Sequence, residues 1–104
     1  MHARVSIYDI PEDRVSEARA SFSDALGTIG ALRGLSEAYF LVSRESGRGV
    51  AMTFWDDHEA MSASRVTASR LRSAAVEAVG GEVVLVDEFE VAVHVTGSQH
   101  AEAV

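Results

Sequence analysis

The sequence predicts an α+β domain with the element order β-α-β-β-α-β. Four short runs rich in β-branched and aromatic residues alternate with two segments whose apolar residues recur every three or four positions. The two central runs are joined by a short turn that contains glycine, as is typical of a hairpin. This order gives an antiparallel four-stranded sheet with both helices on one face, the ferredoxin-like arrangement.

The first strand and the first helix occupy the first thirty residues. Residues 4–10 are β-branched and aromatic at most positions and end at Pro11, so they predict a strand. Asp9, Pro11 and two further acidic residues predict the start of a helix. Its apolar face is expected at Val15, Ala18, Phe22, Leu26 and Ile29. The helix is expected to fray near Gly27 and Gly30.

The central hairpin is predicted from residues 35–43 and 49–55, with Ser46 and Gly47 in the turn between them. That turn places Phe40 and Val42 on one face with Thr53 and Trp55. It places Tyr39 and Leu41 on the other face with Met52 and Phe54. Because both faces are apolar, we expect the sheet to be covered on both sides.

The second helix and the last strand complete the domain. Asp56 and Glu59 form a capping-box pattern directly after the third strand. The apolar stripe of the helix is expected at Met61, Ala68, Leu71, Ala75 and Val79, before Gly80 and Gly81. Residues 82–95 predict one long strand with a bulge at Asp87. We therefore expect one domain over residues 1–95 and a flexible tail over residues 96–104.

Both helices cover the same face of this sheet, which leaves the opposite face without a cover. A monomer with valine, phenylalanine and methionine across a whole sheet face would expose a large apolar patch. A second copy of the chain is the simplest cover. The sequence therefore predicts a two-fold homodimer, a dimeric α+β barrel.

Composition and charge exclude several classes of function. The net charge of −7 disfavours nucleic acid and anionic membranes as partners. The chain has no Cys and no Lys, which excludes thiolate chemistry and a Schiff base. The histidines His2, His58, His94 and His100 are not spaced as metal ligands. We expect no metal and no cofactor. The start of the chain does not read as a secretory signal, so a cytoplasmic location is expected.

Three segments resemble the antibiotic biosynthesis monooxygenase-like domains of the dimeric α+β-barrel superfamily. They are residues 32–35 (LRGL), the hairpin residues 41–49 (LVSRESGRG) and, above all, residues 53–61 (TFWDDHEAM). The last segment is similar to the family's tryptophan, acidic pair and Glu-Ala step between strand three and helix two. The resemblance covers nearly the whole predicted domain and implies its fold. The superfamily mixes oxygenases, haem-degrading enzymes and small-ligand proteins, so it implies no single activity.

The resemblance implies a cavity between sheet and helices, and it supplies candidate residues. Trp55 corresponds to the family's cavity tryptophan and could stack on an aromatic ligand, although a core anchor at the strand end explains it as well. Arg65 lies near the position of the histidine ligand in haem-degrading relatives and could meet an anionic group, or could be solvated. The other cavity candidates are Tyr8, Tyr39, Phe40 and Met61. No catalytic residue is assigned.

The chain contains no Asn, although the oxygenase and haem-degrading relatives use one together with the tryptophan. Since position 65 is also not a histidine, haem degradation is disfavoured. Two classes of function remain open. The favoured one is a non-catalytic dimer that binds a small apolar or aromatic ligand or serves as a structural module. The alternative is a cofactor-independent monooxygenase that acts on a phenol or hydroquinone.

Overall fold

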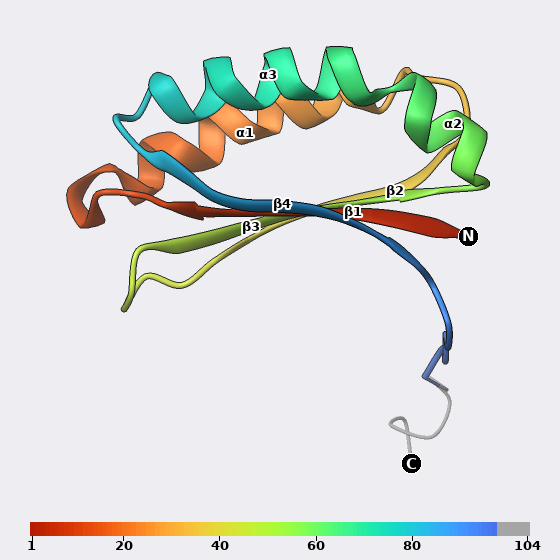
Figure 1. The fold of residues 1–104 in the computed structure, drawn as a ribbon. Coiled ribbons are helices and arrows are strands. Elements are labelled where there is room, and N and C mark those ends of the chain that lie inside the picture. The colour runs from red at the N-terminus through yellow and green to blue at the C-terminus, as the bar shows by residue number, and fades with distance from the viewer. Residues whose placement is uncertain (98–104) are drawn as a thin grey trace.

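The computed structural model describes residues 1–97 and confirms the ferredoxin-like α+β fold (Figure 1). The elements are β1 (His2–Asp9), the short 3-10 helix η1 (Glu12–Arg14), α1 (Val15–Ile29), β2 (Leu35–Val42), β3 (Arg48–Trp55), α2 (His58–Ala63), α3 (Arg65–Glu77) and β4 (Glu82–Glu90). The sheet order is β2-β3-β1-β4, and all neighbours are antiparallel. The helices lie on one face of the sheet, as predicted.

The central strand β1 divides its side chains between the two faces of the sheet. Arg4, Ser6 and Tyr8 are buried, whereas Val5 and Ile7 are only half-buried. Because successive side chains of a strand point to opposite faces, the first set faces the helices and the second set faces away from them. Two of the three side chains under the helices are therefore polar, and one carries a charge.

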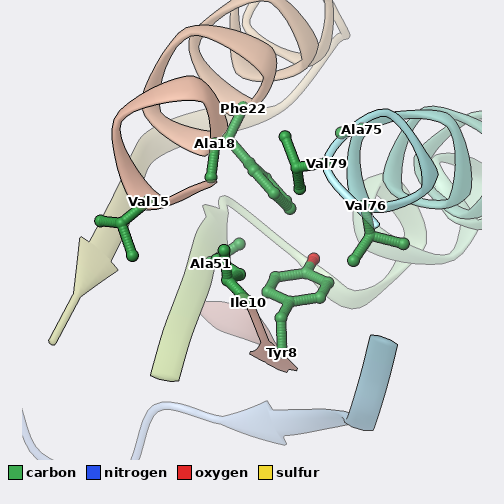
Figure 2. Packing of buried hydrophobic residues seen from close by; sticks show 9 residues of the cluster. All are labelled: Tyr8, Ile10, Val15, Ala18, Phe22, Ala51, Ala75, Val76 and Val79. Atoms are coloured by element: carbon green, nitrogen blue, oxygen red, sulfur yellow. The ribbon is translucent and has the colours of Figure 1, made fainter. Parts of the chain in front are cut away.

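The core between sheet and helices consists of two clusters. The first joins α1, α3 and the sheet around Tyr8 and Phe22, as Figure 2 shows. Phe22 stacks on Phe40, with ring centroids 4.4 Å apart, and lies 4.8 Å from the Tyr8 ring. The second cluster contains the fully buried Trp55 with Met61 of α2 and neighbours from α1 and α3. The apolar stripes predicted for the helices supply most of both clusters.

The hairpin has the predicted faces but a longer turn. Tyr39 pairs with Met52 and Phe40 with Ala51, so the parity of the predicted register is correct. The Ser43 amide donates to the Arg48 carbonyl oxygen at 2.8 Å, which makes the loop four residues long. A shift of two residues leaves every side chain on its face. Gly47 has a φ of +73°, and a Cβ there would lie 2.5 Å from the Ile10 carbonyl oxygen.

The starts of the helices differ from the prediction. The cap of α2 is Asp57, not Asp56: its Oδ1 accepts the Ala60 amide at 2.8 Å. The Asp56 amide instead donates to the Gly34 carbonyl oxygen, which holds Asp56 at the strand exit. Asp9 belongs to β1 and does not cap the first helix, where the N-cap residue of η1 has no side-chain hydrogen bond.

The second predicted helix is broken in two. The helical run after β3 is divided at Ser64, which ends α2 and precedes α3. The Ser64 hydroxyl donates to the Met61 carbonyl oxygen at 2.7 Å. A side-chain bond of this kind competes with the regular helix, which explains why the two pieces are separate.

The last strand is shorter than predicted and ends at Glu90, not at residue 95. The reason is the partner strand: His2, the first residue of β1, pairs with Glu90, and the Val91 amide then bonds to the Met1 carbonyl oxygen. No further residue of β1 is available to residues 91–95. The bulge lies between the Val83 and Leu85 pairs, and not at Asp87.

After Glu90 the chain bends away from the side that carries the helices (Figure 1). Val93 and Val95 in this arm, residues 91–97, are each 82% exposed. The predicted flexible tail falls mostly on residues 98–104, which lie outside the described residues. The division into a domain over 1–95 and a tail therefore stays a prediction.

The face of the sheet opposite the helices is apolar and uncovered within residues 1–97. We call it the open face. Its exposed large side chains are Tyr39, Leu41, Leu85 and Phe89, and its half-buried ones are Val5, Ile7, Val50, Met52 and Phe54. None of the helices formed by these residues is long and apolar enough to cross a bilayer.

Candidate functional site

A small cavity of about 30 Å³ lies between the sheet and the helices α1 and α3. Its apolar wall comes mainly from α1, with Phe22, Ala25, Leu26 and Ile29, and also from Ala51 and Ala68. Its polar wall comes mainly from the helix-facing side of the sheet, with Arg4, Ser6, Tyr8 and Thr53, and from Arg72 of α3. The polar groups are hydroxyls and guanidinium groups.

An open groove of about 340 Å³ runs between α3 and β4. It is lined by Arg4, Arg65, Ser69, Arg72, Val86, Asp87 and Glu88. Arg4 and Arg72 line both the groove and the cavity. The two arginines therefore lie where the cavity and the solvent-open groove adjoin.

Arg4 is the most buried charged side chain of the site, at 4% exposure. Its guanidinium donates to the Glu88 carboxylate at 2.8 Å and to the Met61 carbonyl oxygen at 2.9 Å. A third bond, at 3.0 Å, goes to the Ser64 hydroxyl. Burial lowers the pKa of Arg4, and the bond to Glu88 opposes this change. Because a buried charge is costly without partners, these acceptors are what keep Arg4 under the helices.

Glu88 holds two arginines at once. Arg65, more than half exposed, donates through Nε and Nη2 to the same carboxylate that binds Arg4. The hydrogen bond from Arg65 is the largest cause that lowers the pKa of Glu88; with the bond and charge of Arg4, and against the opposing effect of burial, it brings this pKa to about 2. The Glu88 amide also donates to Asp87 Oδ1 at 2.8 Å. Glu88 is therefore ionised and fully engaged at neutral pH.

Tyr8 provides a phenol group to the cavity. In Figure 2 its ring rises from β1 with the hydroxyl directed toward the helices. Burial raises the pKa of Tyr8, and the neighbouring Ser6 and Arg72 oppose this change only in part. The hydroxyl is therefore protonated at neutral pH and can donate a hydrogen bond.

Four of the residues predicted from the sequence lie in or beside the core under the helices. Tyr8 lines the cavity, and Phe40 reaches it indirectly through its stacking on Phe22. Trp55 does not line the cavity. Its Nε1 donates to the Thr53 Oγ1 at 3.0 Å, and Thr53 is a lining residue. Met61 packs with Trp55 in the second core cluster.

The other two predicted residues lie elsewhere. Tyr39 is exposed on the open face, where it meets Phe54 edge-on at 6.1 Å between ring centroids. Arg65 lines the groove and is paired with Glu88. Neither residue lines the cavity.

The sequence reasoning missed the residues that carry most of the polarity of the site: Arg4, Ser6, Thr53, Arg72 and Glu88. Strand alternation could have found Ser6, since it lies two residues from Tyr8 on the same face. Arg72 lies one position after the apolar Leu71 on the helix, and no sequence signal distinguishes it from solvated arginines such as Arg70.

The histidines do not form a metal site in residues 1–97, where no three His, Asp or Glu side chains gather around a common point. The rings of His2 and His58 meet edge-on at 5.5 Å between centroids. His94 is exposed in the arm. His100 lies outside the described residues.

The fold is that of the antibiotic biosynthesis monooxygenase-like domains. A Deinococcus radiodurans protein provisionally named an antibiotic biosynthesis monooxygenase superimposes with a TM-score of 0.75 at 12% identity, over 93% of this chain and 100% of that one. SnoaB from Streptomyces nogalater, a cofactor-independent oxygenase, gives 0.72 at 14% identity, over 92% and 97%. A variant of MhuD with two manganese protoporphyrin IX molecules per active site gives 0.69 at 20% identity, over 93% and 100%. These likenesses show a shared fold and no shared activity.

Two uncharacterized proteins of Mycobacterium tuberculosis are similar in sequence. MT2634 of strain CDC 1551 / Oshkosh and Rv2557 of strain H37Rv are each 32% identical to this chain over 90 residues. The match covers 86% of this chain but only 40% of each relative, so this chain spans less than half of their length. No family model matches the chain.

The low pKa of Glu88 predicts a loss of stability in acid. The ordinary value of 4.5 falls to about 2 in the folded state, so this contribution is complete above about pH 4.5 and is lost as the pH falls toward 2. We expect Glu88→Gln to remove this part of the pH dependence. We also expect it to lower the free energy of unfolding at neutral pH by about 2 kcal/mol, because Arg4 loses its carboxylate. Urea unfolding at neutral pH and in acid measures both effects.

The matched control is Glu90→Gln, two residues further on the same strand, where the carboxylate is exposed and has no ion pair within residues 1–97. We expect Glu90→Gln to change the free energy of unfolding by no more than about 0.5 kcal/mol, both at neutral pH and in acid. Equal acid sensitivity in the Glu88 variant and the unchanged protein would contradict the role of Glu88.

Proposed function

We propose that this chain is a non-catalytic, homodimeric domain that binds a small ligand at the cavity and groove bounded by Arg4 and Arg72. The observation that supports this proposal is a small cavity with one apolar wall and one polar wall, which shares two arginines with a solvent-open groove. Apolar pockets with a few convergent polar groups are the usual binding sites of small molecules.

The two volumes limit how such a ligand can lie. A cavity of about 150 Å³ holds benzene, whereas about 15 Å³ suffices for one water. The cavity here, at about 30 Å³, has room for a group of two or three atoms and not for a ring. The groove, at about 340 Å³, has room for a ring. A small aromatic ligand would therefore place its polar end in the cavity and its ring in the groove.

The groups around the site favour binding over catalysis. The cavity is lined by hydroxyls and guanidinium groups, and no carboxylate or imidazole within residues 1–97 lines it. The nearby Glu88 has a pKa of about 2, which makes it a poor general base. The shared fold of SnoaB keeps a cofactor-independent oxygenase acting on a phenol or hydroquinone as the second candidate.

The open face and the arm together favour a second copy of this chain as the partner. The open face carries exposed Leu85 and Phe89 at its β4 edge, and the arm that follows carries exposed Val93 and Val95. The arm leaves the sheet on the side of the open face (Figure 1). A second copy packed on that face would cover the sheet and give the arm an apolar surface to contact.

We also propose a cytoplasmic location. This proposal rests only on the expectation drawn from the sequence.

The homodimer predicts a mass near twice 11.1 kDa in solution at micromolar concentration. We expect Phe89→Asp to raise the dissociation constant at least 100-fold, about 3 kcal/mol, because it places a charge in an apolar interface. The control is Val66→Asp, on an exposed helical position of α3, which should leave the mass unchanged. Sedimentation equilibrium measures both variants. A monomer mass for the unchanged protein at tens of micromolar would contradict the homodimer.

The ligand site predicts a saturable change in the fluorescence of Trp55, the only tryptophan, when phenol or 2-naphthol binds. The signal arises because Trp55 bonds to Thr53, which lines the cavity. We expect Ala68→Leu to abolish the change, because the larger side chain fills the cavity, at a stability cost of about 1 to 3 kcal/mol.

The control for this experiment is Ala20→Leu, an exposed position on α1, which should bind as the unchanged protein does. Circular dichroism confirms that both variants are folded. Unchanged fluorescence across the compounds, or normal binding by the Ala68 variant, would count against the site. Consumption of oxygen with conversion of the phenol would replace the proposal with the oxygenase.

A further inference from the structure

Arg72 differs from the other two arginines of the site because no carboxylate of residues 1–97 pairs with it. Arg4 and Arg65 both pair with Glu88, at 2.8 and 2.5 Å. Within residues 1–97, no Asp or Glu lies within ion-pair distance of Arg72, although its side chain is half-buried. A partly desolvated cation without a counter-charge at the boundary of a cavity is a ready anion-binding group.

The local charge differs in sign from the charge of the whole chain. The groove is lined by three arginines and two acidic residues, Asp87 and Glu88. Both carboxylates are engaged, Glu88 by two arginines and Asp87 by the Glu88 amide. One positive charge therefore remains at this site on a chain of net charge −7. This balance favours an anionic ligand over a neutral one.

We propose that the ligand is a small organic carboxylate, whose two oxygens occupy the cavity mouth against Arg72 and the Tyr8 hydroxyl while its apolar body lies in the groove. The inference rests on the proposed function, because it names the chemical class that the same site selects. A carboxylate matches the planar fork of a guanidinium group and can accept two parallel hydrogen bonds from it.

Size and hydrogen bonding both fit this arrangement. The cavity of about 30 Å³ has room for the two oxygens of a carboxylate. Burial raises the pKa of Tyr8, so its hydroxyl stays protonated and donates to the anion. The groove offers Val86 and the aliphatic stems of the arginines to an apolar body.

Isothermal titration calorimetry with benzoate and with benzyl alcohol, its neutral counterpart, tests the inference on the full chain. We expect benzoate to bind at least 10-fold more tightly than benzyl alcohol. Arg72→Gln should remove this preference by weakening benzoate about 10-fold while benzyl alcohol binds as before, because only the anion loses a charge-assisted bond. Arg70→Gln is the matched control: it lies on the exposed side of the same helix and should change neither affinity.

The outcomes separate the inference from the proposed function. Equal affinity for the two compounds, or a preference for benzoate that survives in Arg72→Gln, would overturn the carboxylate assignment while the ligand site stands. An equal loss in Arg70→Gln would show a general charge effect and would also overturn it. If neither compound binds and the fluorescence of Trp55 is silent with every phenol, the proposed function fails and the inference fails with it.

Discussion

The ion pair between Arg4 and Glu88 is the constraint on which the rest of this structure depends. Arg4 lies on the central strand with its side chain under the helices, at 4% exposure. Removing a guanidinium group from water costs several kcal/mol unless its donors are satisfied. Glu88 stands directly opposite Arg4 in the pairing of β1 with β4, so the register of the edge strand supplies the counter-charge. A slip of β4 by one residue would turn Glu88 to the open face and leave Arg4 unpaired.

The same pair explains how the polar side of the site is organised. Arg4 also donates to the Ser64 hydroxyl and to the Met61 carbonyl oxygen, at the point where α2 ends and α3 begins. The break in the helix therefore provides acceptors that an unbroken helix would not. Glu88 in turn binds Arg65, the first residue of α3. Glu88 is shared by these two arginines, and no carboxylate of residues 1–97 pairs with Arg72 beside the cavity.

The sequence could predict the order of elements and the faces of the strands, because both follow from local periodicity. Phe40 and Trp55 were placed correctly on one face even though the turn was two residues too short. The same alternation places Tyr39 on the other face of the sheet from Trp55. Tyr39 could therefore have been removed from the cavity candidates on the sequence alone. The end of β4 could not be predicted, because it depends on where β1 begins. Arg4 was missed because a charged residue in a short strand normally points to solvent, and only the pairing with Glu88 reverses this.

A double-mutant cycle between Arg4→Met and Glu88→Leu, measured by urea unfolding at neutral pH, tests most directly whether this pair organises the fold and the site. Each single variant leaves one charge under or beside the helices without its partner, whereas the double variant replaces both charges with apolar groups. We expect each single change to destabilise the protein by about 2 kcal/mol or more, and the double variant to recover much of this loss. Single effects that add to within about 0.5 kcal/mol would contradict it.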